Sequence, residues 1–197
     1  MITKSIVLSA LMAGLSSLPV SAVFAAPAAS AASSALAASS VPAASVVQPA
    51  PDTTFLRAVH QANMAEIAGG NIAQERGVSS RVRALGARFV RDHTAIDTRL
   101  TAVARAAGVM LPDTPTAAQL ALTKRYQSVP SSSFDRLYLH TQLKAHNEAL
   151  AAGKAELANG QDTRVKQLVA YAAPLVQAHH DALTAALATS SYGSPAR

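Results

Sequence analysis

The sequence predicts an all-α protein, a four-helix bundle in which two antiparallel helix hairpins are joined by a long crossover. Four segments between residues 52 and 188 repeat apolar residues with the 3.6-residue period of an amphipathic helix. Within each pair of segments the connection is short, whereas residues 108–132 separate the two pairs. The chain is rich in alanine and contains only 4% aromatic residues, which favours close-packed helices over sheets.

Residues 1–25 have the features of a cleavable signal peptide. Lys4 precedes a short apolar run at 6–18, and Val23 and Ala25 are small residues at the −3 and −1 positions of a cleavage site. The run is shorter than the roughly 20 residues that a transmembrane helix needs. We therefore expect no transmembrane span, and export to the periplasm or cell envelope after cleavage near Ala25.

The next segment, 26–51, consists almost entirely of Ala, Ser, Pro and Val. Its prolines interrupt any helix and it offers little to bury, so it predicts a disordered linker. Residues 189–197 predict a disordered tail. The bundle domain is therefore expected over 52–188, which is long enough for one substantial core.

Capping residues define the four expected helices. Each segment starts at a side chain that can accept a hydrogen bond from a free N–H group of the first turn. The helices are expected over 52–76, 79–107, 133–158 and 162–188, with a short additional helix at 116–127. Gly108 and Gly160 supply stop signals. A long crossover between two hairpins is how ferritin-like bundles are built, and a simple up-down bundle does not need one.

Each long helix carries an ionisable residue within its apolar face. These residues are Glu66, His93, His146 and His179. Burying a carboxylate or an imidazole is costly unless it is paired. With a rise of about 1.5 Å per residue from each turn, the two members of each hairpin match in height to within one or two helical turns. The sequence thus predicts a polar centre in the core, with Asp92, Tyr138 or Gln142 near it.

Two interpretations of this centre remain open. Neutral imidazole and carboxylate suit Zn²⁺, Cu²⁺, Fe²⁺ or Mn²⁺, so the four residues can be ligands of a metal ion or contacts of a small ligand. Alternatively they form a metal-free Glu/His network that fixes helix register in a structural or interaction module.

Enzymatic chemistry has less support. Carboxylate-bridged di-iron bundles use Glu-x-x-His on two helices, but Val90 and Val176 stand three residues before the histidines. We find no phosphate-binding loop and no nucleophile elbow. The sequence therefore marks no catalytic residues and leans against an enzyme.

Composition excludes several other classes. The formal charge is +6, but the basic residues are scattered and lack stacking aromatics, so we expect no nucleic-acid binding. The absence of cysteine excludes disulfides and thiolate metal sites. A protein partner or a homodimer remains open.

Several runs together resemble a bacterial family. They are Ala65–Ile67, Phe89–Thr94, Phe134–Tyr138 followed by His146, and Ala173–Leu175 followed by His179. Over 54–188 the chain resembles the ferritin-like domain-of-unknown-function family "four-one-four-two", whose members are often labelled outer membrane proteins. Members usually have Met at Phe89 and Leu at Ala173, and both changes keep an apolar residue. The resemblance implies an exported ferritin-like bundle and no established activity. We therefore expect an uncharacterised periplasmic protein, with metal or small-ligand binding in envelope stress as the leading hypothesis.

Overall fold

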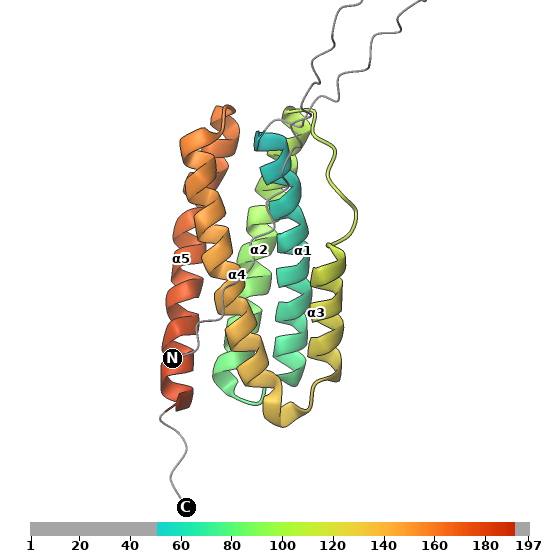
Figure 1. Cartoon of the computed structure of the whole chain (residues 1–197), viewed down its shortest axis with the longest axis vertical. Coiled ribbons are helices and arrows are strands. Elements are labelled where there is room, and N and C mark those ends of the chain that lie inside the picture. The colour runs from blue at the N-terminus through green and yellow to red at the C-terminus, as the bar shows by residue number, and fades with distance from the viewer. Residues whose placement is uncertain (1–50, 192–197) are drawn as a thin grey trace, which may run out of the picture. The chain divides into compact units, whose positions relative to one another are not determined.

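The computed structural model describes residues 51–191 and contains five helices there (Figure 1). They are α1 (Pro51–Arg76), α2 (Ser80–Ala106), α3 (Ala117–Ser128), α4 (Ser131–Asn159) and α5 (Thr163–Ser191). No strand occurs in this range. The all-α class and the short extra helix are confirmed. The expected signal peptide and all but the last residue of the linker lie outside the described residues.

The helix boundaries differ from the expected ones by up to three residues. α1 already begins at Pro51, because a proline at the first helical position loses no intrahelical hydrogen bond. α5 continues to Ser191, so residues 189–191, which we had expected in the tail, are helical. Between Pro174 and Gly193 the sequence contains no Gly or Pro that would end the helix earlier.

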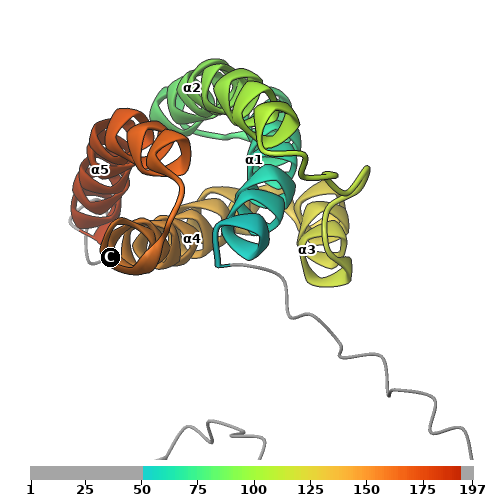
Figure 2. The same ribbon diagram turned by 90° about the horizontal axis from the view of Figure 1, so that it is seen from above.

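The four long helices form a ring in the order α1, α2, α5, α4 (Figure 2). α1 packs against α2 and α4, and α5 packs against α2 and α4. The segment from α2 to α4 runs along the length of the bundle, and α3 lies outside the ring beside α1 (Figures 1 and 2). This arrangement confirms the ferritin-like topology of two hairpins and one long crossover.

Carboxylates tie the two hairpins together at both ends of the bundle. The backbone N–H groups of Val78 and Ser79, in the α1–α2 turn, each donate to Asp135 of α4 at 2.8 Å. At the opposite end, the N–H groups of Gln161 and Asp162 donate to Asp52 of α1 at 3.0–3.1 Å. In both places a carboxylate of one hairpin accepts hydrogen bonds from backbone N–H groups in the turn of the other hairpin. These N–H groups lie at the start of a helix, which is the positive end of its dipole.

Glycines permit the close contact between α1 and α2. A Cβ atom added to Gly86 would lie 2.5 Å from the carbonyl oxygen of Gly70 and 2.9 Å from the Cβ of Ala73. The two backbones therefore approach at a level where a larger side chain cannot fit.

The apolar core is divided into two clusters. The larger one lies toward the α1–α2 turn and includes Phe89, Phe134, Tyr138 and Leu183. The smaller one lies toward the other end and consists of Leu56, Leu100, Ala104, Val165 and Leu168. Along α1, α2 and α5, the residues between the two clusters include buried polar side chains. The bundle thus has a polar layer across its middle.

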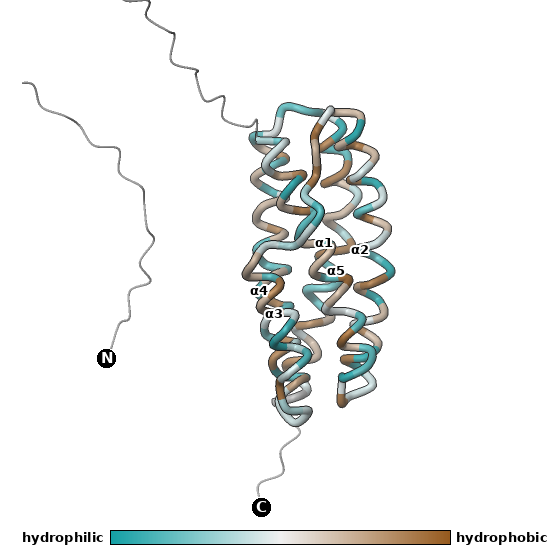
Figure 3. Tube along the Cα trace, turned by 90° about the vertical axis from the view of Figure 1, so that its right-hand side faces the viewer, coloured by the Kyte–Doolittle hydropathy of each residue, from teal (hydrophilic) through white to brown (hydrophobic). Residues whose placement is uncertain are grey.

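Figure 3 shows apolar residues at intervals along every helix, separated by polar ones. In residues 51–191 no helix combines the length and the apolarity that a bilayer-crossing segment requires.

Candidate metal centre

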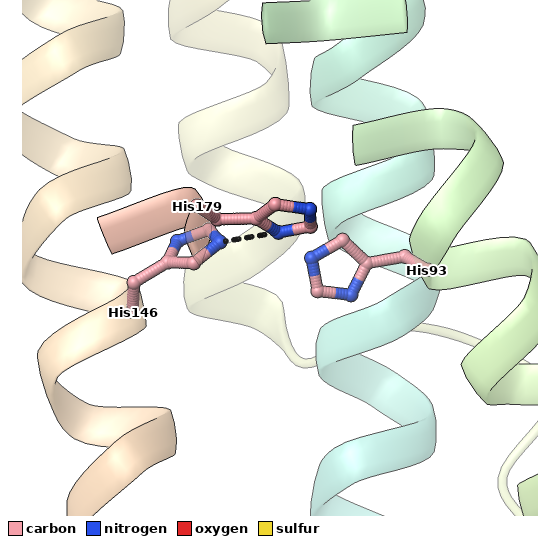
Figure 4. Close-up of side chains that lie close together, drawn as sticks. All are labelled: His93, His146 and His179. Carbon is pink, nitrogen blue, oxygen red and sulfur yellow. Dashed lines mark hydrogen bonds between the residues drawn. The ribbon is translucent and has the colours of Figure 1, made fainter. Parts of the chain in front are cut away.

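Three of the four expected residues meet in the polar layer. His93 of α2, His146 of α4 and His179 of α5 point toward one another (Figure 4). One nitrogen from each ring lies within 4.8 Å of the other two. All three side chains are buried, with exposed fractions of 6%, 2% and 0% respectively. Three helices therefore bring three imidazoles to one point.

The outer nitrogen of each ring has a defined hydrogen-bond acceptor. His93 Nδ1 lies 3.0 Å from the side-chain oxygen of Asn63. His146 Nδ1 lies 2.9 Å from the backbone carbonyl of Gln142. His179 Nε2 lies 2.8 Å from the carboxylate of Asp92. Because these oxygens only accept, each outer nitrogen carries the proton and donates it.

The inner nitrogens consequently carry lone pairs. A neutral imidazole has one N–H, and in each ring that N–H already faces outward. His93 Nε2 is buried and has no hydrogen-bond partner. His146 Nε2 and His179 Nδ1 lie 3.3 Å apart with no N–H left to share between them. Three acceptors thus face one another, an arrangement that a cation stabilises.

The spacing agrees with a metal site. Two nitrogens at about 2.0–2.1 Å from a tetrahedral ion lie about 3.3 Å from each other, which equals the separation between His146 Nε2 and His179 Nδ1. The third ring needs only a small inward movement, because the longest separation in the group stays within 4.8 Å.

The three imidazoles are in the neutral form that binds metals. Burial, together with the neighbouring His146 and His179, lowers the pKa of His93 from 6.5 to about 3, against the opposing effect of Asp92. Burial likewise lowers the pKa of His146 to about 4, against the hydrogen bond to Gln142. The pKa of His179 is also lowered by burial, against the opposing effect of Asp92. No proton has to leave these rings at neutral pH before a cation binds.

Asp92 is held as an ionised acceptor for His179. Burial alone would raise the pKa of Asp92, but hydrogen bonds from Arg91 and His179 outweigh it and the pKa is lowered. Arg91 Nε lies 2.8 Å and Arg88 Nε 3.5 Å from its oxygens. A carboxylate behind a ligating histidine fixes the ring orientation and raises its basicity. The sequence predicted Asp92 near the centre but did not assign it to any one histidine.

Asn63 and Asp97 are the residues that the sequence analysis missed. Asn63 Nδ2 donates to Asp97 at 3.1 Å, which turns the Asn63 oxygen toward His93. His60 Nδ1 lies 2.8 Å from the same carboxylate. Asn63 lies three residues before Glu66 and therefore on the same helix face, but an uncharged amide does not stand out in a search for ionisable groups.

Glu66 lies outside the group of three histidine nitrogens. With its amide nitrogen turned toward α1, Gln142 donates to the two carboxylate oxygens of Glu66 at 3.0 and 2.5 Å. Burial raises the pKa of Glu66 from 4.5 to about 8, against the opposing effect of this hydrogen bond. Tyr138, also expected near the centre, stacks on Phe89 and belongs to the larger apolar cluster. The role of Glu66 as a ligand stays a prediction.

A cavity of about 680 Å³ reaches this centre. Glu66, Gln142, His93 and His146 line it, whereas His179 does not. Two of the three imidazoles are therefore accessible from the cavity, and the third lies behind them against Asp92.

Comparisons with known proteins agree with the fold. The model of the family described as "Domain of unknown function (DUF4142)" matches residues 33–186, which confirms the resemblance read from the sequence. No curated protein matches the chain. Among solved structures, a DUF305 fragment from Deinococcus radiodurans superposes with a TM-score of 0.63 at 14% identity, and the match covers 72% of this chain and 99% of that one. At this identity the likeness concerns the fold alone.

Proposed function

Because the chain belongs to the family described as "Domain of unknown function (DUF4142)", whose description names no activity, we propose from its own residues that it binds one transition-metal ion through His93, His146 and His179. The observation that carries this proposal is the orientation of the three rings. Each outer N–H is donated to a fixed acceptor, so three lone pairs converge in a buried space.

The ligand set favours zinc or copper. Imidazole nitrogen suits both ions, whereas manganese prefers oxygen ligands and non-haem iron usually has a carboxylate beside its histidines. Three protein ligands leave a fourth position on a tetrahedral ion. Glu66 lines the same cavity as His93 and His146, so its carboxylate is a candidate for that position, either directly or through a water molecule.

The cellular role that we propose is non-catalytic metal binding in the periplasm, in the context of envelope stress. The signal-peptide features of residues 1–25 support a role outside the cytoplasm. A buried site held by outer hydrogen bonds on three helices would also couple metal binding to the stability of the bundle.

The test is a metal titration of residues 26–197 prepared without a His tag. Native mass spectrometry and competition titration with Zn²⁺, Cu²⁺, Fe²⁺ and Mn²⁺ should give one equivalent of zinc or copper. Binding should be lost in His93→Gln and His179→Gln. It should persist in His140→Gln, which removes an exposed histidine of α4.

Two other outcomes decide the alternatives. No metal above background under any condition would favour the metal-free network and a structural or interaction role. Retention of the metal with a weaker affinity in Glu66→Ala would identify Glu66 as the fourth group, whereas an unchanged affinity would remove it from the site.

A further inference from the structure

The cavity beside the histidines arises from small side chains on α4. The smaller apolar cluster receives residues from α1, α2 and α5 but none from α4. Along α4 the small residues Ala145, Ala149, Ala152 and Gly153 line the cavity instead, and Ala149 and Ala152 are exposed to solvent. Larger residues at these positions would close the core. The space of about 680 Å³ is within the range of roughly 300–1,000 Å³ typical of small-molecule sites.

The walls that α1, α4 and α5 contribute to this cavity are mostly apolar, whereas α3 adds Gln119 and Thr123 to the lining. Phe55 and Val59 of α1, Leu150 of α4, and Leu168 and Val176 of α5 line it. None of these side chains offers a hydrogen bond, so along most of its length the cavity suits a hydrocarbon chain.

Polar groups gather at the inner end. Glu66, Gln142, His93 and His146 line the cavity there, and each is at least nine-tenths buried. His93 Nε2 has no hydrogen-bond partner. A buried unpaired acceptor costs free energy unless something binds to it. The inner end of the cavity therefore suits a polar group, whereas the walls suit an apolar one.

Exposed residues mark the opening. Lys144, Glu148, Lys154 and Leu157 line the cavity and are exposed to solvent. Lys144 and Glu148 form an ion pair, whereas Leu157 is an exposed large apolar side chain, at 43%. A molecule can thus enter from the surface and extend inward to the histidines.

We propose that this cavity binds a single-chain amphipathic molecule of the fatty-acid class, with its alkyl chain between α1, α4 and α5 and its carboxylate at the inner polar end. The assignment of the alkyl chain depends only on the shape of the cavity and on its apolar walls. The carboxylate part rests on the proposed metal with Glu66 outside its coordination sphere, because a carboxylate oxygen of the bound molecule then fills the fourth position of the three-imidazole site. Gln142 lines this inner end together with His93 and His146.

The experiment uses residues 26–197 and displacement of the fluorescent probe 11-(dansylamino)undecanoic acid by octanoate, decanoate and dodecanoate. Each added methylene should tighten binding about fourfold if it leaves water for the cavity. This dependence should already be present in metal-free protein. Loading with zinc or copper should tighten binding of dodecanoate but leave dodecyltrimethylammonium, which has no coordinating head group, unchanged.

A matched pair of variants on α5 locates the site. Ala172→Phe adds a ring inside the cavity, because Ala172 lines it, and should weaken dodecanoate binding tenfold or more. Ala170→Phe adds the same ring at an exposed position outside the lining and should bind like the wild type. Circular dichroism checks that both variants fold, and the chain-length series on the wild type does not depend on either of them.

Binding that does not strengthen with chain length, or that is equally weakened in both variants, would overturn the cavity assignment. An intact series with no effect of bound metal would overturn the carboxylate assignment. If no metal binds but the series is intact, the proposed metal function fails while the alkyl site stands. If metal binds but binding does not depend on chain length, the alkyl site fails while the proposed metal function stands.

Discussion

The raised pKa of Glu66 makes a quantitative prediction about stability. In the metal-free protein, burial raises the pKa of this carboxyl from 4.5 to about 8. The folded state therefore binds a proton that the unfolded state has released. Its contribution to stability is complete below pH 4.5 and is lost as the pH rises through 8. Replacing Glu66 by Gln removes this titration and keeps a group of similar size.

The magnitude follows from the shift. Between pH 6.5 and 8.5 the linkage relation gives a loss of about 2 kcal/mol from Glu66 in the wild type. Histidines add their own pH dependence, since their pKa values are lowered in the folded state. These contributions are common to both proteins and cancel in the difference. Relative to the wild type, Glu66→Gln should therefore gain about 2 kcal/mol across this interval.

Urea denaturation in the presence of a chelator, followed by circular dichroism at several pH values, measures this difference. Glu148→Gln removes an exposed carboxylate of α4 and controls for the loss of one charge. Parallel pH profiles for wild type and Glu66→Gln would refute the buried, protonated state of Glu66. A gain of equal size in Glu148→Gln would assign the effect to net charge instead.

Three further changes test other parts of the structure. Asp92→Asn should weaken metal binding about 10- to 100-fold without changing its stoichiometry, because the carboxylate orients a ligating ring; competition titration measures this, and an unchanged affinity would argue against that role. Asp135→Ala should lower the free energy of unfolding by about 1–3 kcal/mol, because two hydrogen bonds to a charged group are lost. Urea denaturation measures this loss, and a loss below the error of that method would contradict a stabilising role of these hydrogen bonds. Gly86→Ala should cost about 1–3 kcal/mol or more, because the new Cβ meets the backbone of Gly70; a variant as stable as the wild type in the same assay would show that the helices can separate there.

The fold could be predicted because its determinants are local. Apolar periodicity, caps and the length of the crossover define the helices and their order without knowledge of any tertiary contact. The three histidines could be predicted for a related reason. Height along a helix follows from residue counting at about 1.5 Å per residue, and residues on the inner faces of neighbouring helices at the same height must be close.

The rest of the site depends on packing that counting does not provide. Whether Glu66 contacts the histidines or Gln142 depends on how α1 and α4 pack against each other, and in this structure it contacts Gln142. Likewise, the hydrogen bonds that Asp52 and Asp135 accept from the turn of the other hairpin join residues far apart in sequence, so residue counting does not predict them. The cavity was not predicted either, because small residues on α4 are equally compatible with close packing against a neighbouring helix. Only the assembled bundle shows that no larger side chain fills that space.

The most direct test of the central claim is X-ray absorption spectroscopy at the metal edge of the zinc- or copper-loaded protein. We expect three imidazole nitrogens, at about 2.0–2.1 Å for zinc, with one further light-atom ligand. His179→Gln, prepared with the same amount of metal, should lose one imidazole from the spectrum. A shell made mainly of oxygen, or one with fewer than three imidazoles in the wild type, would contradict a metal centre built from His93, His146 and His179.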